Sequence, residues 1–228
     1  AGTGIYEAVI SNHDGHIYVT AAGSRNVPGG AIYKLDPTSL SIVDSISLKD
    51  NPPFGIAINN NTQTVYTTNT RSNSVSAVDI RSGKLLATIT HGGEKSHTRE
   101  VLVDEKNNLV YVSDVGDPSS IWVIDGKTNK YLHTLENIGK TVTGMVFAPG
   151  KTDVLYVTVM SDNAIAKVNT KTRKVEKTFP SGGEAPVNIA SDGKHLFVAN
   201  QKSGTITVLD DSGNLIHSIP TGDGAIGI

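Results

Sequence analysis

The sequence contains no cysteine, and this absence excludes several kinds of chemistry together. Disulfide bonds, thiolate catalysis, c-type haem attachment and zinc–thiolate sites all require that side chain. Acidic and basic residues nearly balance, with 20 Lys and Arg against 22 Asp and Glu. No global positive field is therefore expected to attract nucleic acid or an anionic membrane. No apolar run approaches the roughly 18 residues that a membrane-spanning helix needs, so we expect no membrane span.

Helical periodicity is also missing, and a repeat takes its place. Five segments combine an aromatic residue in a β-branched run with a small polar loop and a second apolar run that ends in Asp or Asn. The aromatic positions are spaced by 48, 45, 45 and 41 residues: Tyr18, Tyr66, Tyr111, Tyr156 and Phe197. The acid or amide positions are spaced by 43, 46, 44 and 41 residues: Asp36, Asp79, Asp125, Asn169 and Asp210. Both markers give a period near 44, which is typical of four-stranded β-propeller blades.

Each repeat is predicted to hold four short antiparallel strands. In the fourth repeat we place them at 143–148, 154–160, 164–169 and 174–179. The run IWVI at 121–124 is apolar throughout, which is expected where both faces of a strand are buried between neighbouring blades. We expect Trp122, the only tryptophan, either to pack between blades or to lie partly exposed on a blade face. The Asp or Asn that begins the last turn is expected to accept hydrogen bonds from the backbone amides of that turn.

The predicted fold class is therefore all-β, a single β-propeller domain over 1–228. Its blades are expected near 5–50, 51–91, 97–137, 141–180 and 184–221. The ending PTGDGAIGI resembles NPPFGIAIN at 51–59, so residues 225–228 are predicted to open a sixth blade. Five blades in an open fan would leave uncovered strand edges, and we therefore expect the propeller to be incomplete at its C-terminus.

The repeated [IVL]-Y-V-[TS] stretch resembles the YVTN β-propeller repeat family. Within it, GGAIYKLDPTSL at 29–40, PPFGIAINNNTQTVYTTNT at 52–70, REVLVD at 99–104 and IWVIDG at 121–126 are similar to the bacterial YncE-like proteins. The resemblance covers essentially the whole chain. It implies a seven-bladed propeller that is periplasmic or otherwise exported, with no secure shared activity. This chain departs from the family pattern in holding only about five blades.

Propellers bind ligands on the face where two sets of loops surround the central channel. One set enters the innermost strand of each blade, and the other joins its second and third strands. The residues that these loops offer as a ligand-binding rim are Tyr6, Glu7, Arg25, Phe54, Asn69, Arg71, Asp162, Asn188, Asn200 and Lys202. We expect side chains that are far apart in the sequence to meet there.

The segment KSHTRE at 95–100 supplies the candidate catalytic residues. His97 is a candidate base or metal ligand, Arg99 a candidate ligand for a carboxylate or phosphate, and Glu100 a candidate acid or base. The alternative is a solvated loop in which Arg99 pairs with a nearby acid. Asp114 and Asp117, in SDVGDP, are weak candidates for a divalent cation, since the same residues are ordinary turn formers. We expect no metal and no cofactor.

Three functions stay open on the sequence. The favoured one is an exported, non-enzymatic binding or scaffold propeller whose rim takes a protein, a peptide or a small polar ligand. The second is a lyase or lactonase that uses His97, Arg99 and Glu100. The third is single-stranded nucleic-acid binding, with Arg25, Arg71, Arg99 and Lys202 as a basic patch and Tyr6 or Phe54 as a stacking surface.

Overall fold

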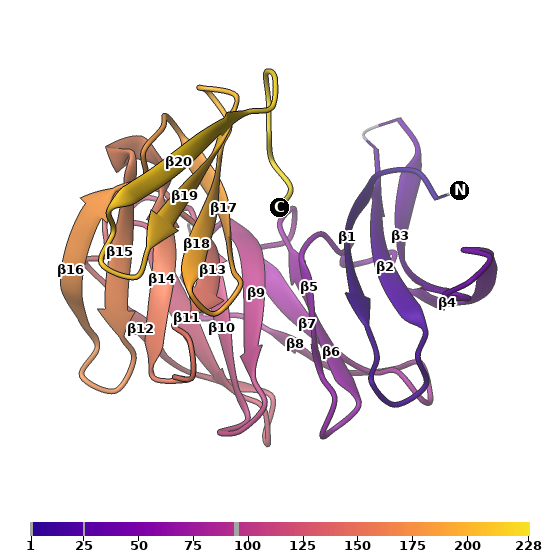
Figure 1. Ribbon diagram of the computed structural model, residues 1–228. Helices are drawn as coiled ribbons and strands as arrows, with labels where there is room; N and C mark the ends of the chain where they lie inside the picture. The colour runs from indigo at the N-terminus through magenta and orange to yellow at the C-terminus, as the bar shows by residue number, and fades with distance from the viewer. Residues whose placement is uncertain (1, 25, 94–95) are drawn as a thin grey trace. The chain divides into compact units, whose positions relative to one another are not determined.

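The computed structural model describes residues 2–24, 26–93 and 96–228. Within these ranges the strands form five antiparallel four-stranded sheets, each built from four consecutive strands (Figure 1). The sheets are the blades of a β-propeller, as the repeat predicts. The one helical element of the described residues is a single 3-10 turn, η1 (Met160–Asp162). No helix in these ranges has the length and apolar character needed to cross a lipid bilayer.

The strand bounds follow the predicted repeats closely. Blade 1 holds β1 (Ile5–Ile10), β2 (Ile17–Gly23), β3 (Pro28–Leu35) and β4 (Ile42–Ser47). Blade 2 holds β5 (Ile56–Asn59), β6 (Thr64–Asn69), β7 (Ser74–Asp79) and β8 (Lys84–Ile89). Blade 3 holds β9 (Thr98–Asp104), β10 (Leu109–Asp114), β11 (Ser120–Asp125) and β12 (Lys130–Leu135). Blade 4 holds β13 (Val142–Phe147), β14 (Val154–Val159), β15 (Ala164–Asn169) and β16 (Lys174–Pro180). Blade 5 holds β17 (Pro186–Ser191), β18 (His195–Asn200), β19 (Thr205–Asp210) and β20 (Leu215–Pro220).

The chain divides into two compact units. Unit 1 comprises residues 1–112 and 122–133, and unit 2 comprises residues 113–121 and 134–228. Blades 1 and 2 and most of blade 3 therefore belong to unit 1, whereas blades 4 and 5 belong to unit 2. Each unit has its own core and its own candidate site.

The buried apolar clusters of both units lie between neighbouring blades, and unit 1 has one between blades 1 and 2 as well as one between blades 2 and 3. In unit 1, Tyr66 and Val75 of blade 2 pack with Val110, Trp122 and Ile124 of blade 3. Unit 2 has an equivalent cluster, to which blade 4 contributes Tyr156, Ile165 and Phe179 and blade 5 contributes Leu196 and Leu209. This arrangement explains the continuous apolar runs, because an inner strand is covered on both faces. Trp122 is fully buried, which confirms its predicted packing role.

The aromatic residue of the repeat also links one blade to the next. The hydroxyl of Tyr66, on β6, donates to Asn129 Oδ1 at 2.8 Å in the β11–β12 turn. The hydroxyl of Tyr156, on β14, donates to the backbone oxygen of Asp211 at 3.0 Å in the β19–β20 turn. The tyrosine therefore contributes a buried ring to the core and a directional bond to the neighbouring turn.

Removing one of these hydroxyls is expected to have a small and specific effect. Tyr66→Phe keeps the buried ring and loses the bond to Asn129, so we expect the free energy of unfolding to fall by about 1 kcal/mol. Urea denaturation followed by circular dichroism measures this change. Tyr33→Phe is the control, because the Tyr33 hydroxyl forms no hydrogen bond with the part of the chain that the structure describes. Equal effects of the two substitutions would contradict an inter-blade role for Tyr66.

The acid or amide that begins the last turn of each blade has the predicted structural role. Asp36 Oδ1 accepts the Ser39 amide at 2.7 Å, and Asn169 Oδ1 accepts the Thr172 amide at 3.0 Å. Asp79, Asp125 and Asp210 accept turn amides in the same way. These bonds lower the pKa of the Asp36 carboxyl, chiefly through the Ser39 amide. The repeated acid is therefore explained by turn chemistry and needs no catalytic role.

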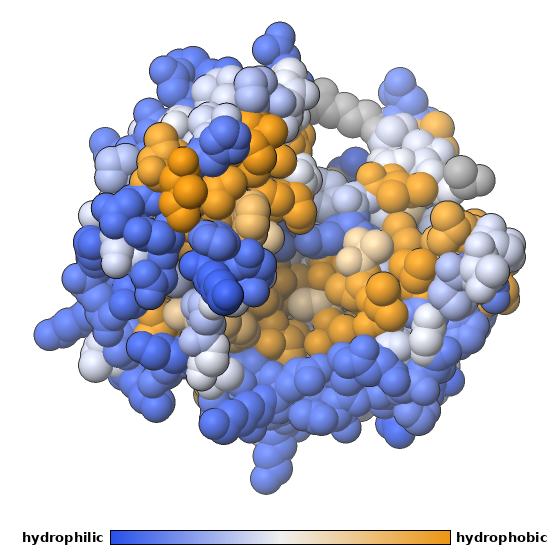
Figure 2. Space-filling model, in the orientation of Figure 1, coloured by the Kyte–Doolittle hydropathy of each residue, from blue (hydrophilic) through white to orange (hydrophobic). Residues whose placement is uncertain are grey.

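Apolar side chains are exposed on several strands, among them β1 in unit 1 and β20 in unit 2. In unit 1, β1 exposes Ile5 and Ile10, and in unit 2, β20 exposes Leu215, Ile216 and Ile219. Figure 2 shows apolar side chains gathered over both strands. Residues 225–228 follow β20 and pair with no described strand. The predicted sixth blade and the predicted incompleteness of the propeller stay predictions.

Candidate functional site

A β-bulge at the start of β1 positions the first two residues of the candidate site. Ile5 pairs with Ala21 and Ala8 pairs with Val19, so Tyr6 and Glu7 together lie opposite a single residue of β2. An extra residue of this kind bends the strand and redirects its side chains. The same break in register occurs in β13, between Val142 and Met145. The bulge is thus a recurring feature of the innermost strands.

Threonines of the repeat fix the backbone beside the bulge. Thr20 Oγ1 bonds with the backbone of Glu7 and donates to the Phe54 carbonyl of the next blade. One blade further on, Thr68 Oγ1 accepts the Gly55 amide at 2.8 Å and donates to the Arg99 carbonyl at 2.7 Å. These hydroxyls therefore place the innermost strands of blades 1, 2 and 3 at fixed positions within unit 1.

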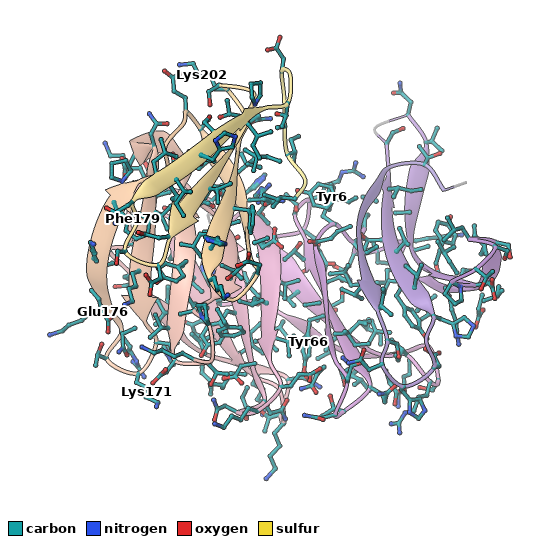
Figure 3. The ribbon with its side chains drawn as sticks, viewed as in Figure 1. Tyr6, Tyr66, Lys171, Glu176, Phe179 and Lys202 are labelled. Carbon is teal, nitrogen blue, oxygen red and sulfur yellow. The ribbon has the colours of Figure 1, made fainter. Side chains whose placement is uncertain are left out.

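Tyr6, Phe54 and Arg71 form the exposed part of the site, which we call the Arg71 platform. The rings of Tyr6 and Phe54 meet edge to face, with their centroids 5.5 Å apart. The Arg71 guanidinium lies 5.2 Å from the Phe54 centroid, within cation–π range. Arg71 Nη1 also donates to the Ala22 carbonyl at 2.9 Å. Tyr6 is 45% exposed and lies on the bulged start of β1 (Figure 3), so the platform faces solvent.

Glu7 and Glu100 form the inner part of the site, which we call the carboxyl pair. The two carboxyls are hydrogen bonded to each other, so one of them carries a proton at the contact. Glu7 Oε2 also accepts the Ile56 amide at 2.8 Å. Arg99 Nη1 lies 3.5 Å from Glu100 Oε2, and both of these side chains are only 15% exposed. A guanidinium and a carboxyl of the pair are therefore buried side by side.

The pKa values of the pair follow from these contacts. Burial raises the pKa of Glu100 to about 8, and the charge of Glu7 adds to this rise, whereas Arg99 opposes it. Burial also raises the pKa of Glu7, against the stabilising amide of Ile56. At neutral pH Glu100, whose pKa is about 8, therefore keeps its proton. Arg99 adds a positive charge beside the pair and Arg71 adds another on the platform, so the two arginines together favour an anionic group.

Gly55 allows the three blades to approach one another at this point. A Cβ atom added there would lie 2.6 Å from the Arg99 carbonyl oxygen, 2.9 Å from Thr68 Oγ1 and 3.3 Å from Glu7 Oε2. The first two separations are shorter than real Cβ contacts allow. A glycine is therefore required where the carboxyl pair meets the innermost strand of blade 2.

Several predicted rim residues lie elsewhere in the structure. Asn69 and Asn200 are buried, and their side-chain amides bond inside their own blades, to Ser74 and Ser76 and to Thr207 respectively. A buried, bonded amide is not accessible to a rim ligand, which corrects both assignments. His97 is exposed and precedes β9. Arg25 and Lys95 lie outside the described residues.

The predicted rim residues of unit 2 form no comparable cluster among the described contacts. Asp162 is exposed, and its carboxylate accepts the Lys140 amide at 2.9 Å. Lys202 pairs with Glu184 at 2.7 Å in an exposed position. Asn188 is half-buried on β17. A cavity of about 700 Å³ lies in this unit, lined by residues 115–119 and 137–141 and by Ser161.

The two acids proposed as weak cation ligands differ in their surroundings. Asp114 is buried, and its carboxylate accepts the Gly116 amide at 2.9 Å, which is ordinary turn geometry. Asp117 is exposed and precedes a cis proline, Pro118. Across residues 2–24, 26–93 and 96–228, no group of three or more His, Asp or Glu side chains is placed to hold a metal ion.

Sequence reasoning missed the residues that support the site. Thr20, Thr68 and Gly55 make its backbone contacts, and none of them was predicted to matter. A signal was present, because the threonine follows the repeat aromatic by two positions in blades 1, 2 and 4. The periodicity of the sequence could identify this position in each repeat, but it could not show that the hydroxyl there bonds to two blades.

The fold and the bulged inner strands define a β-propeller, and comparison with known proteins places the chain within that class. The chain belongs to the YNCE-like beta-propeller family, whose model matches residues 5–228. It is 32% identical to YncE of Salmonella typhi over 96% of this chain and 31% identical to YncE of Escherichia coli K12 over the same share. The chain spans 65% of the length of these two relatives.

More distant similarities extend the comparison. YwhL of Bacillus subtilis is 26% identical over 92% of this chain and 45% of its own length. A chain in the crystal structure of the nidogen/laminin complex superposes with a TM-score of 0.78 at 14% identity, and the match covers 95% of this chain and 80% of the other. That likeness concerns the fold alone. The names of the YncE and YwhL relatives state no activity.

Proposed function

We propose that this protein is a non-enzymatic binding propeller, and that the Arg71 platform with the carboxyl pair is its ligand site. The ligand is a peptide or a small polar molecule that presents an anionic group next to an apolar one. The observation that carries the proposal is the exposed guanidinium of Arg71, held over Phe54 and by the Ala22 carbonyl. A guanidinium fixed in this way can bind a carboxylate with little loss of side-chain entropy.

The surroundings of Arg71 support this choice of ligand. Tyr6 and Phe54 offer aromatic surface beside the guanidinium, which suits an apolar side chain adjacent to the bound carboxylate. Glu100 keeps its proton at neutral pH because its pKa is about 8, so the carboxyl pair does not carry two negative charges against the arginines. The free C-terminus of a peptide that ends in an apolar residue combines the two required features.

Short peptides that end in Phe or Leu provide the test. We expect peptides with a free C-terminal carboxylate to raise the melting temperature of the protein, and their amidated forms to bind about tenfold more weakly. Arg71→Ala is expected to weaken binding of the free-carboxylate peptides by a similar factor. Isothermal titration calorimetry measures both differences.

The matched control is Arg81→Ala. Arg81 is an exposed arginine of the same unit, in the β7–β8 turn, where it pairs with Asp79 at 3.1 Å. This substitution removes the same charge and is expected to leave peptide affinity unchanged. Equal binding of free and amidated peptides, or equal effects of the two arginine substitutions, would contradict the proposed site. Failure of every peptide in the set to bind would contradict the proposed ligand class.

One observation favours an enzymatic alternative. Glu100 has a pKa raised toward neutrality and lies beside Arg99, which is the setting of a general acid or base. A lyase or lactonase would use Glu100 for proton transfer and Arg99 to hold developing negative charge. Loss of lactone opening in Glu100→Gln would support this alternative. The substitution His97→Ala tests the role of His97 separately. Absence of turnover in the unmodified protein would exclude it for the lactones tested.

The place of action is a further part of the proposal. We propose that the protein is exported, as the resemblance of its repeats to the YncE-like proteins implies. Fractionation of cells that produce the full-length native protein, with separate markers for cytoplasm and exported proteins, tests this. Recovery with the cytoplasmic marker would contradict it. Single-stranded nucleic acid as a ligand stays a prediction.

A further inference from the structure

We propose that unit 2 contains a second binding site, for a small phosphate-type anion with two or more negative charges. The site is a cavity of about 750 Å³ between blades 4 and 5, separate from the residues of the Arg71 platform. Four lysines line it, Lys151, Lys167, Lys177 and Lys194, together with the acids Glu176 and Asp211. Its size is in the usual range for small-ligand sites.

The lysines reach the cavity from four separate segments. Lys151 lies in the β13–β14 turn, Lys167 on β15, Lys177 on β16 and Lys194 in the β17–β18 turn. Lys167 and Lys177 are direct cross-strand partners in the antiparallel pair of β15 with β16. Like charges in directly opposite positions repel one another. An anion bound between the two ammonium groups would turn this repulsion into attraction.

The acids of this region do not balance the lysines. Glu176 lies 3.6 Å from Lys167, but it also accepts the Asn169 side-chain amide at 2.9 Å. Figure 3 labels Glu176 on the outer strand of blade 4. Asp153 pairs with Lys171 at 2.9 Å, and Asp192 lies 3.0 Å from the His195 ring. Asp153 also interacts electrostatically with Lys151, and Asp211 lines the cavity as a second acid, so the four lysines face two lining acids.

Three of the lysines form no ion pair with a carboxylate of the described residues. Lys177 Nζ donates to the Ser212 carbonyl at 2.7 Å, a neutral acceptor, and lies 5.8 Å from the centroid of the Phe179 ring. For Lys151 and Lys194, the described residues include no carboxylate within ion-pair distance. Their side chains are exposed, and they are available to a ligand.

The aromatic residue of the fourth repeat is part of the cavity wall. This residue is Tyr156, and its hydroxyl is bonded to the Asp211 backbone, which ties blade 4 to the β19–β20 turn. The lysines are therefore carried by the two outer strands of blade 4 and by short turns of two blades. Ammonium groups act as point charges and lack the planar geometry of a guanidinium. They suit a compact tetrahedral anion, which is bound by charge, better than a planar carboxylate.

Pyrophosphate is the probe, and isothermal titration calorimetry at low ionic strength is the measurement. We expect saturable binding at one site. The double substitution Lys167→Met with Lys194→Met is expected to weaken it by about tenfold. Lys84→Met with Lys130→Met is the control, because these exposed lysines of unit 1 carry the same total charge and lie outside the cavity. The single substitution Lys194→Met, in an exposed turn, tests the site again should the double variant unfold.

The outcomes separate specific binding from general attraction. A loss in the cavity variants with unchanged affinity in the control supports the site. Equal losses in both double variants would show attraction to net charge and would overturn it, as would absence of pyrophosphate binding. Citrate distinguishes the class of anion, since tighter binding of citrate than of pyrophosphate would overturn the assignment to phosphate. None of these results depends on peptide binding at Arg71.

Discussion

Replacing Trp122 with alanine is expected to lower the free energy of unfolding of the protein by about 3–5 kcal/mol. Trp122 is fully buried in the core between blades 2 and 3, and its ring lies 4.5 Å from the ring of His91. Alanine would leave a large cavity, because the inner strands around it are held by their own hydrogen bonds and can close it only in part. No other substitution of a core residue in unit 1 removes so much buried volume.

Urea denaturation followed by far-ultraviolet circular dichroism measures this loss, since the variant has no tryptophan to report by fluorescence. Leu132→Ala is the control in the same blade. Leu132 is 49% exposed on β12, so its loss is expected to cost no more than about 0.5 kcal/mol. A loss below about 1 kcal/mol for Trp122→Ala would mean that blades 2 and 3 do not pack through this residue.

Glu100→Gln is expected to change how stability depends on pH. The pKa of Glu100 is about 8 in the folded protein, against an ordinary value of 4.5. Between these values the folded state keeps a proton that the unfolded state has released, so stability falls as pH rises from about 4.5 to 8. The decline is at most about 1.4 kcal/mol per pH unit for one full proton. Glutamine keeps a hydrogen-bonding oxygen and does not titrate.

The variant is therefore expected to match the unmodified protein near pH 4.5 and to exceed its free energy of unfolding by about 2 kcal/mol near pH 8. Denaturation curves at a series of pH values measure the difference. Glu136→Gln is the control, because Glu136 is exposed in the segment after β12. Its pH profile is expected to run parallel to that of the unmodified protein. A parallel profile for Glu100→Gln would show that the carboxyl pair does not retain a proton.

The two sites have different physical characters, which is why they are tested with different ligands. The Arg71 platform combines guanidinium, aromatic surface and a buried acid pair, so it can select a ligand by shape as well as charge. The lysine cavity of unit 2 offers point charges and little apolar contact. Its affinity should depend strongly on salt, whereas peptide affinity at Arg71 should depend on the ligand's apolar side chain.

The repeat predicted the local structure well for a clear reason. Strand positions in blade 4 agree with the prediction to within one residue at each end, because each strand is a short apolar run between turns with strong sequence signals. The turn role of Asp36 and Asn169 was also predictable, since it depends on residues two and three positions away. Interactions of this kind depend only on residues that are close together in the sequence.

The candidate site was predicted only in part. Loop positions identified Tyr6, Glu7, Phe54, Arg71, Arg99 and Glu100, which the structure brings together in unit 1. The same reasoning included Asn69 and Asn200, which are buried. Strand alternation cannot foresee such differences near a bulge, where one additional residue changes the direction of the side chains that follow.

The sequence by itself determined the blade repeat, the turn chemistry and the family of the protein, because these depend on spacing and on short-range contacts. Only the tertiary structure decided that Glu7 meets Glu100, 93 positions away, and that four lysines of two blades line one cavity. The reason is physical. The pKa of a carboxyl and the charge of a cavity depend on burial and on neighbours that the packing of different blades supplies, and the spacing of residues along one strand does not contain that information.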